Sequence, residues 1–141
     1  MVYVECMNSI SFTDQLDRVR VLLDSFSPEV VVSEQNSIGA ALNDQLIRDG
    51  YPIQPQFVNW ANKPKFITNL AMLIEEGKLK ILDDPEVVEQ FSSFTSRPST
   101  SVVTRIVYSA PSGAHDDIVI ATALAASVLS IGEVYNSVGL W

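Results

Sequence analysis

The chain has 141 residues, a hydrophobic fraction of 47% and a formal net charge of −8. This length suits one domain with a single core. The acidic balance argues against a protein that grips nucleic acid mainly by its own charge. Cys6 is the single cysteine, which excludes a disulfide framework or a cysteine-based zinc site within one chain. Signal-peptide and membrane-spanning patterns are absent, so we expect a cytoplasmic protein with no membrane contact.

The first half of the chain predicts helices alternating with strands. Ser11 precedes a stretch with apolar residues at helical spacing, which is typical of a capped amphipathic helix. Gly50 closes a second helical pattern. In order, we expect a strand at residues 2–6, a helix at 12–26, a strand at 30–34, a helix at 38–48 and a strand at 56–60.

The second half continues the alternation. We expect a helix at 63–76, a brief strand at 79–81, a helix at 84–91, a hairpin at 94–108 with a polar connection at 97–101, a helix at 116–131 and a tail at 135–141. Helices joined to strands by short segments indicate an α/β fold. We found no internal repeat and no linker, so the prediction is a single domain over residues 1–141.

Two stretches carry candidate chemistry. Glu34 ends a run of β-branched residues, and α/β sheets place ligand-binding groups where such a strand ends. His115, Asp116 and Asp117 precede the long apolar run of the last helix. The simpler interpretations are a solvated glutamate at a strand end and two aspartates that favour a helix start through the helix dipole.

Five segments together resemble one family, the nuclease domain of the large terminase subunit of tailed bacteriophages, which has an RNase H-like (RuvC-type) fold. In the family's order they are VVVSEQNSIG at 30–39, NKPK at 62–65, IEEGKLKI at 74–81, FSSF at 91–94 and YSAPSGAHDD at 108–117. The resemblance covers nearly the whole chain. It implies an α/β fold, namely an RNase H-like mixed sheet flanked by helices.

The resemblance also implies a two-metal site for Mg²⁺ or Mn²⁺. In the family, acidic residues from separate elements hold two ions about 3.5–4 Å apart, which activate water and stabilise the leaving oxygen. Glu34 matches the strand-end acid, and Asp116 and Asp117 match the acids of the final helix. His115 falls where its side chain would orient a metal ligand or bind the metal itself, or it is simply a turn residue that caps the helix. We expect the carboxylates of Glu34 and Asp116 to converge to roughly 4–8 Å.

Lys63 and Lys65, near a predicted helix start, are candidates for phosphate contacts, with a solvated helix end as the alternative. The family's domain begins with a strand that carries a central aspartate, followed by a second strand. Neither has a counterpart in this sequence. We therefore expect an N-terminally truncated, partial domain and an incomplete metal site that binds Mg²⁺ weakly and Mn²⁺ better. The strand that ends at Glu34 would then have an open edge, which predicts a homo-oligomer.

The expected function is that of a metal-dependent endonuclease of a phage DNA-packaging terminase, which cuts concatemeric DNA. The resemblance implies double-stranded DNA, the terminase ATPase domain, the small terminase and the portal as partners. Two alternatives remain open. One is another RNase H-like nuclease, of the Holliday-junction-resolvase type. The other is a non-catalytic prophage relic or assembly module, which predicts no metal at Glu34, Asp116 and Asp117.

Overall fold

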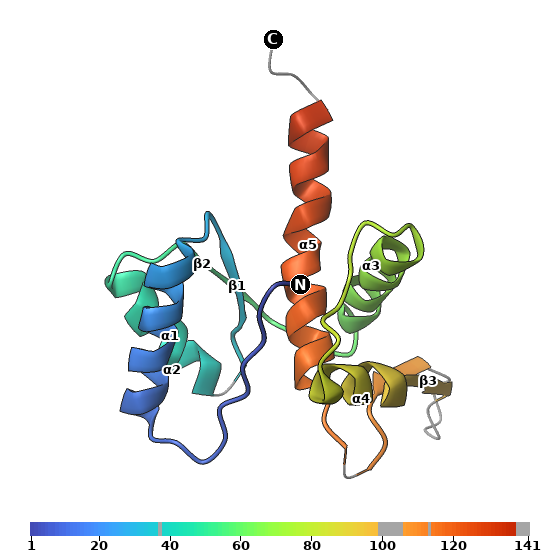
Figure 1. Ribbon diagram of the computed structural model, residues 1–141, viewed down its shortest axis with the longest axis horizontal. Coiled ribbons are helices and arrows are strands. Elements are labelled where there is room, and N and C mark those ends of the chain that lie inside the picture. Colours follow the sequence, from blue (N-terminus) through green and yellow to red (C-terminus); the bar gives the residue numbers. More distant parts are fainter. Residues whose placement is uncertain (37, 99–105, 113, 138–141) are drawn as a thin grey trace. The chain divides into compact units, whose positions relative to one another are not determined.

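A computed structural model describes residues 1–36, 38–98, 106–112 and 114–137. The chain divides into two compact units. The smaller unit is Glu5–Val58, and the larger unit consists of Met1–Val4 and Asn59–Trp141. The smaller unit contains α1 (Phe12–Phe26), β1 (Val31–Glu34), α2 (Ile38–Arg48) and β2 (Ile53–Gln56). The larger unit contains α3 (Lys63–Glu75), α4 (Pro85–Ser93), β3 (Thr95–Pro98), β4 (Ile106–Ser109) and α5 (Asp117–Ser137) (Figure 1).

The two helices of the smaller unit begin and end at the predicted signals. The Ser11 hydroxyl accepts a hydrogen bond from the N–H of Asp14 at 3.1 Å, so α1 has the expected N-cap. Ser27, with φ 43°, ends α1 in the left-handed region. Gly50, with φ 92°, follows α2, and glycine adopts this conformation at little steric cost.

The β1–α2–β2 segment is a parallel strand–helix–strand unit. β1 and β2 pair with Val31 opposite Ile53 and Glu34 opposite Gln56. The ladder is extended by the Gln35 N–H, which donates to the Gln56 carbonyl at 2.8 Å. This topology places Glu34 at the carboxyl end of a parallel strand, where α/β folds gather ligand-binding groups.

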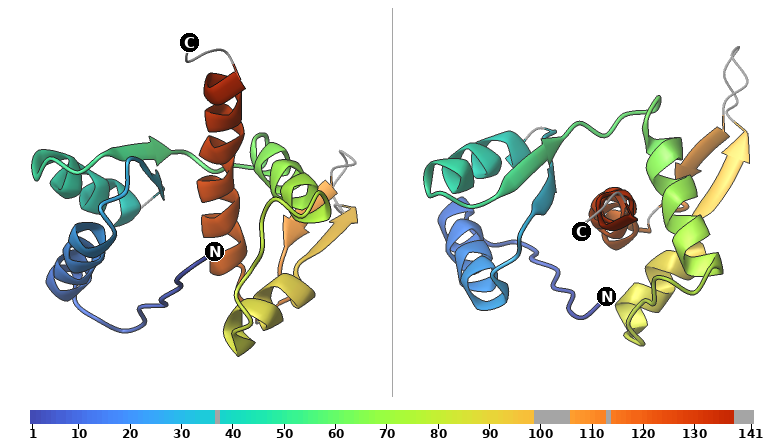
Figure 2. Two further views of the ribbon diagram at one scale, coloured as in Figure 1. Left: turned by 45° about the horizontal axis from the view of Figure 1, so that its top comes forward. Right: turned by 90° about the horizontal axis from the view of Figure 1, so that it is seen from above.

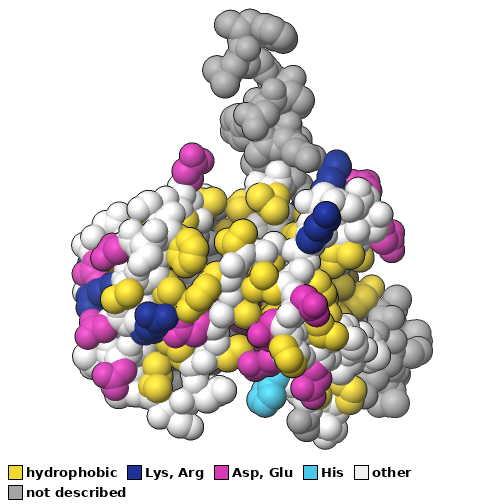
Figure 3. All heavy atoms as spheres, viewed as in Figure 1, with side chains coloured by type: hydrophobic (Ala, Val, Ile, Leu, Met, Phe, Trp, Pro, Cys, Tyr) yellow, Lys and Arg dark blue, Asp and Glu magenta, His cyan; other side chains and the backbone are white. Residues whose placement is uncertain are grey.

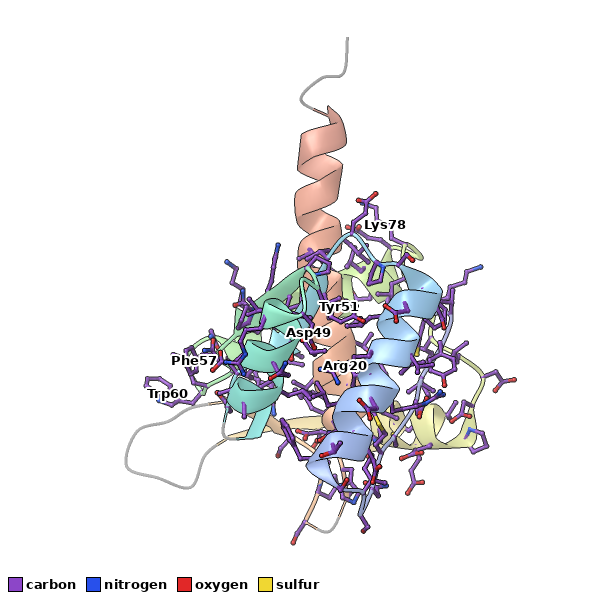
Figure 4. The ribbon with its side chains drawn as sticks, turned by 90° about the vertical axis from the view of Figure 1, so that its left-hand side faces the viewer. Arg20, Asp49, Tyr51, Phe57, Trp60 and Lys78 are labelled. Carbon is purple, nitrogen blue, oxygen red and sulfur yellow. The ribbon has the colours of Figure 1, made fainter. Side chains whose placement is uncertain are left out.

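Charged and polar side chains join α1 to the end of α2 (Figure 4). Arg20 donates to the Asp49 carboxylate at 2.9 Å and to Asp17 at 2.9 Å. The hydrogen bond from Arg20 lowers the pKa of Asp49, and the bond to Asp49 raises the pKa of Arg20. The Tyr51 hydroxyl donates to Asp24 at 2.8 Å, which raises the pKa of the phenol.

In the larger unit α3 and α5 lie side by side (Figure 2). The Asn69 side-chain amide on α3 donates to the Ala126 carbonyl on α5 at 3.1 Å. Both helices, together with α4, supply most of the buried apolar side chains of this unit: Ile67, Leu70, Leu73, Val87, Ile118, Val119, Ile120, Ala123, Leu124 and Ala126. The apolar character of residues 118–126 in the last helix is therefore explained by packing. Among the described residues, no helix is both long and apolar enough to cross a membrane.

α4 and the following hairpin also match the prediction. The Asp84 side chain caps α4 through the N–H groups of Glu86 and Val87, and Pro85 is the first helical residue. β3 and β4 form an antiparallel pair with Thr95 opposite Ser109. Residues 99–101 of the predicted connection and residues 102–105 of the predicted second arm lie outside the described residues, whereas residues 97–98 belong to β3.

Several predicted elements were wrong. Residues 2–6 and 79–81 form no strand. Instead, the N–H groups of Lys78 and Leu79 both donate to the Leu73 carbonyl, which folds this segment back on the end of α3. The strand predicted at 56–60 lies at Ile53–Gln56, because the Asn59 side chain accepts the N–H groups of Ala61 and Asn62 and turns the chain there.

The last helix is longer than predicted, since α5 continues to Ser137 and includes the start of the expected tail. A single glycine, at a cost of about 1 kcal/mol, does not stop a helix that lacks proline. The described strands form two two-stranded sheets, one parallel and one antiparallel. The α/β character predicted from the sequence is thus confirmed, with the described strands paired two by two.

Candidate metal-binding carboxylates

Glu34 lies at the end of β1 with an exposed side chain. The side-chain amide of Asn36 donates to Glu34 Oε1 at 2.6 Å and to the Val58 carbonyl at 2.8 Å. The backbone of Glu34 is held as well, because the amide of Asn43 donates to its carbonyl at 3.2 Å. Asn43 is 1% exposed. Gly39, in the first turn of α2, packs so closely against the Glu34 carbonyl that a Cβ atom there would overlap it.

Asp116 immediately precedes α5 and acts as its N-terminal cap residue, since its carbonyl accepts the N–H of Ile120 at 3.0 Å. Its carboxylate pairs with the Lys63 ammonium, with Nζ 3.0 Å from Oδ2. The two side chains are 23% and 26% exposed. Lys63 also lies over the ring of Phe94, 5.8 Å from its centroid. Lys63 therefore lies against the predicted acid rather than at a solvated helix end.

Asp117 and His115 are both highly exposed. Their side chains are 84% and 79% exposed, and the histidine is visible on the molecular surface in Figure 3. The 3.7 Å between His115 Nδ1 and Asp117 Oδ2 is too long for a hydrogen bond. As predicted, the two aspartates open the last helix, and Asp117 is its first residue.

Gln90 on α4 was missed by the sequence analysis. Its side-chain oxygen accepts the N–H of Ile118 at 2.9 Å, and the residue is 5% exposed. It thus satisfies an amide in the first turn of α5, next to the two aspartates. A signal was present, because Gln90 lies three residues after Val87 on the apolar face of α4, where a polar residue needs a buried partner.

The larger unit brings together Lys63, Asp116, Asp117 and His115, whereas Lys65 is exposed on α3. Glu34 belongs to the smaller unit. Its convergence with Asp116 and Asp117 therefore stays a prediction. Within either unit, the described His, Cys, Asp and Glu side chains form no group of three that could hold a metal ion.

The donor chemistry fits a divalent ion of the magnesium class. Carboxylate oxygens are the ligands that Mg²⁺ and Mn²⁺ prefer. Asp116 already attracts a cation, the Lys63 ammonium, and Glu34 is oriented by a neutral amide. That Glu34, Asp116 and Asp117 hold such an ion stays a prediction.

Comparison with known proteins identifies relatives of one kind. No family model matches the chain. The large terminase subunit of Thermus virus P23-45 is 30% identical over 128 residues, which are 90% of this chain. The nuclease of the large terminase from thermophilic phage G20c, solved with bound magnesium, is 30% identical, with a TM-score of 0.76 over 86% of this chain. The same nuclease has been solved with bound cobalt and with bound zinc. The nuclease domain of the large terminase from Thermus phage P74-26 is 28% identical, with a TM-score of 0.72.

The chain spans 26% of the length of the P23-45 large subunit and 64% of the solved G20c nuclease. The matching region lies within the nuclease in each solved structure. Sequence and structure agree over most of the chain, and the α/β architecture agrees with the RNase H-like fold implied by the motifs. The chain is therefore a homologue of the nuclease domain of the phage large terminase subunit.

Proposed function

We propose that this chain is the nuclease part of a phage DNA-packaging terminase and takes part in metal-dependent cleavage of double-stranded DNA. One observation carries the proposal. This chain is related to terminase nucleases that bind metals, and its Asp116 and Asp117 lie at the start of α5. Its strand-end Glu34 lies at the carboxyl end of a parallel strand. These are the places where an RNase H-like nuclease needs its acids.

The proposed roles follow from the contacts. Glu34, Asp116 and Asp117 hold the metal, which in a two-metal site supplies an activated water and stabilises the leaving oxygen. Asp117 is exposed and therefore accessible to an ion from solvent. Lys63 balances the charge of Asp116 before the ion arrives. Lys65 lies two residues after Lys63 on α3, and its exposed ammonium contacts a DNA phosphate.

We propose Mg²⁺ or Mn²⁺ as the ion. The donors are hard oxygens, and the affinity order of divalent metals does not favour Mg²⁺ at a weak site. We therefore expect Mn²⁺ to bind more tightly than Mg²⁺. His115 is a further neighbour of Asp117, close enough to turn toward a bound ion or its water shell.

The partners are proposed from the same relationship. They are double-stranded DNA, the terminase ATPase domain, the small terminase and the portal, in the cytoplasm of the host cell.

We propose that the two compact units work as one nuclease domain. Among the described strands of the smaller unit, β1 pairs with β2 alone. The other edge of β1 is a template for a further strand, which supports the predicted homo-oligomer. Light scattering tests the oligomeric state.

Metal binding and DNA cleavage by the purified chain test the proposal. Isothermal titration calorimetry with Mn²⁺ should show binding that is weakened in Glu34→Gln, Asp116→Asn and Asp117→Asn. Nicking of plasmid DNA in Mn²⁺ should weaken in the same three variants. Gln45→Ala, which alters an amide on α2, is the control and should behave as the wild type. A wild-type chain that binds no Mn²⁺, or acidic variants that bind it equally well, would refute the proposed function.

A further inference from the structure

We infer that Asn36 is a positioning residue for Glu34, holding the carboxylate so that one oxygen remains directed at an incoming divalent ion. The inference rests on the proposed metal role of Glu34 and extends it to a residue that is not itself a ligand. Residues around metal ligands often fix the orientation of the ligand and tune its affinity.

The side-chain amide of Asn36 uses its full donor capacity. A side-chain amide has two N–H donors. Both are used here, one on Glu34 Oε1 at 2.6 Å and one on the Val58 carbonyl at 2.8 Å. The amide therefore joins the end of β1 to the segment that follows β2. Because it is anchored to backbone at Val58, Asn36 is a fixed donor rather than a side chain that follows Glu34.

Glu34 keeps one carboxylate oxygen that accepts no hydrogen bond among the described residues. Its side chain is exposed, and an exposed glutamate samples many rotamers unless something holds it. Asn36 holds Oε1, and no hydrogen bond among the described residues reaches Oε2. The contact thus restricts the rotamer while leaving a carboxylate oxygen for a metal ion.

The backbone beneath the Glu34 carboxylate is also held in place. Asn43 donates to the Glu34 carbonyl at 3.2 Å, and Gly39 brings the first turn of α2 against the same oxygen. The main chain of Glu34 is thus held from α2, while its side chain is held from Asn36. A neutral donor suits this role, because it orients the carboxylate without cancelling its charge.

A double-mutant cycle separates positioning from a general structural role. Mn²⁺ affinity is measured by calorimetry for the wild type, Asn36→Ala, Glu34→Gln and the double variant. If Asn36 acts through Glu34, Asn36→Ala lowers affinity by about tenfold to a hundredfold, yet adds nothing once Glu34 is replaced. Gln45→Ala is the matched control, because Gln45 also donates an amide to a carboxylate, Asp49 Oδ1 at 2.9 Å, and should leave Mn²⁺ affinity unchanged.

The outcomes distinguish the two proposals. A wild-type chain that binds no Mn²⁺ overturns the metal function and the positioning role together. Wild-type affinity in Asn36→Ala, or an equal loss in the Glu34→Gln background, overturns the positioning role alone. Should Asn36→Ala fail to fold, the side-chain amide NMR signals of Asn36 are compared in the wild type and Glu34→Ala. They should shift when the carboxylate is lost, while those of Gln45 stay in place, and an unshifted Asn36 signal overturns the inference.

Discussion

The two compact units hold their predicted metal ligands in different ways. In the smaller unit Glu34 ends a strand and accepts a hydrogen bond from the neutral amide of Asn36. In the larger unit Asp116 precedes a helix and pairs with the Lys63 ammonium. The first arrangement leaves the carboxylate its full negative charge. The second neutralises the carboxylate, so an ion that binds there competes with a cation already in place.

The backbone supports of the two ligands are alike, however. Each unit uses a buried amide side chain next to its acid. Asn43 donates to the Glu34 carbonyl, whereas Gln90 accepts an N–H from the first turn of α5. The main chain is thus anchored in both units, and the difference lies in the charge beside the carboxylate. Both halves of this comparison can be tested by substitution.

The largest expected effect on the free energy of unfolding is that of Gly39→Ala, which disturbs the packing of α2 against the Glu34 carbonyl. Alanine favours a helix over glycine by about 1 kcal/mol, so a permissive site would be stabilised. Here the new methyl group meets the Glu34 carbonyl, and overpacking against backbone should instead destabilise the fold by about 2–3 kcal/mol. Urea unfolding measures the change. The exposed Ala41→Ser on the same helix should cost much less, and a stabilised Gly39→Ala would show that α2 is not held against β1.

Gln90→Met should have the next largest effect and tests the anchor in the larger unit. Methionine has a similar length but offers no strong acceptor, so the buried N–H of Ile118 loses its partner. Leaving a buried donor unsatisfied should cost about 2 kcal/mol in the free energy of unfolding. Gln45→Met, on the half-exposed side of α2, is the control and should be close to neutral. Equal unfolding midpoints for both variants would show that Gln90 does not support α5.

Lys63→Met tests the charge difference between the two ligands. The Lys63–Asp116 pair is about a quarter exposed, so its attraction is screened to about 1 kcal/mol or less. Removing the ammonium should therefore raise Mn²⁺ affinity by roughly fivefold at most, opposite in sign to Asn36→Ala. Lys65→Met makes the same charge change on an exposed residue that is not in contact with Asp116. If Lys63→Met weakens Mn²⁺ binding, Lys63 supports the ion instead of competing with it.

The smallest expected effect is a pH dependence of the folding stability that arises in the smaller unit. The pKa of Asp49 is lowered in the folded state by its hydrogen bond to Arg20. The stabilisation from this pair is fully present above the unfolded pKa of about 3.9 and is lost as pH falls through the lower folded value. Thermal unfolding between neutral and acidic pH should show a weaker dependence for Asp49→Asn than for the wild type. Asp44→Asn, on the exposed side of α2, controls for the lost charge.

The helices and most of their ends, although not the end of α5, could be predicted from local signals. The side chains of Ser11 and Asp84 cap α1 and α4 by accepting backbone N–H groups. Gly50 and Gly77, which have positive φ, follow the ends of α2 and α3. The position of Glu34 at a strand end and of Asp116 and Asp117 at a helix start was also predictable. These features depend on neighbours a few residues apart, so periodicity and capping chemistry suffice to find them.

Strand pairing and the partners of the acids came only from the folded chain. The strand at Ile53–Gln56 exists because it pairs with β1, and the apolar segments at 2–6 and 79–81 form no ladder. Lys63 reaches Asp116 across 53 positions, and Asn36 reaches Val58 across 22. No local pattern encodes such contacts, because a lysine or asparagine side chain is compatible with solvent, phosphate or a distant carboxylate until packing brings one of them within reach.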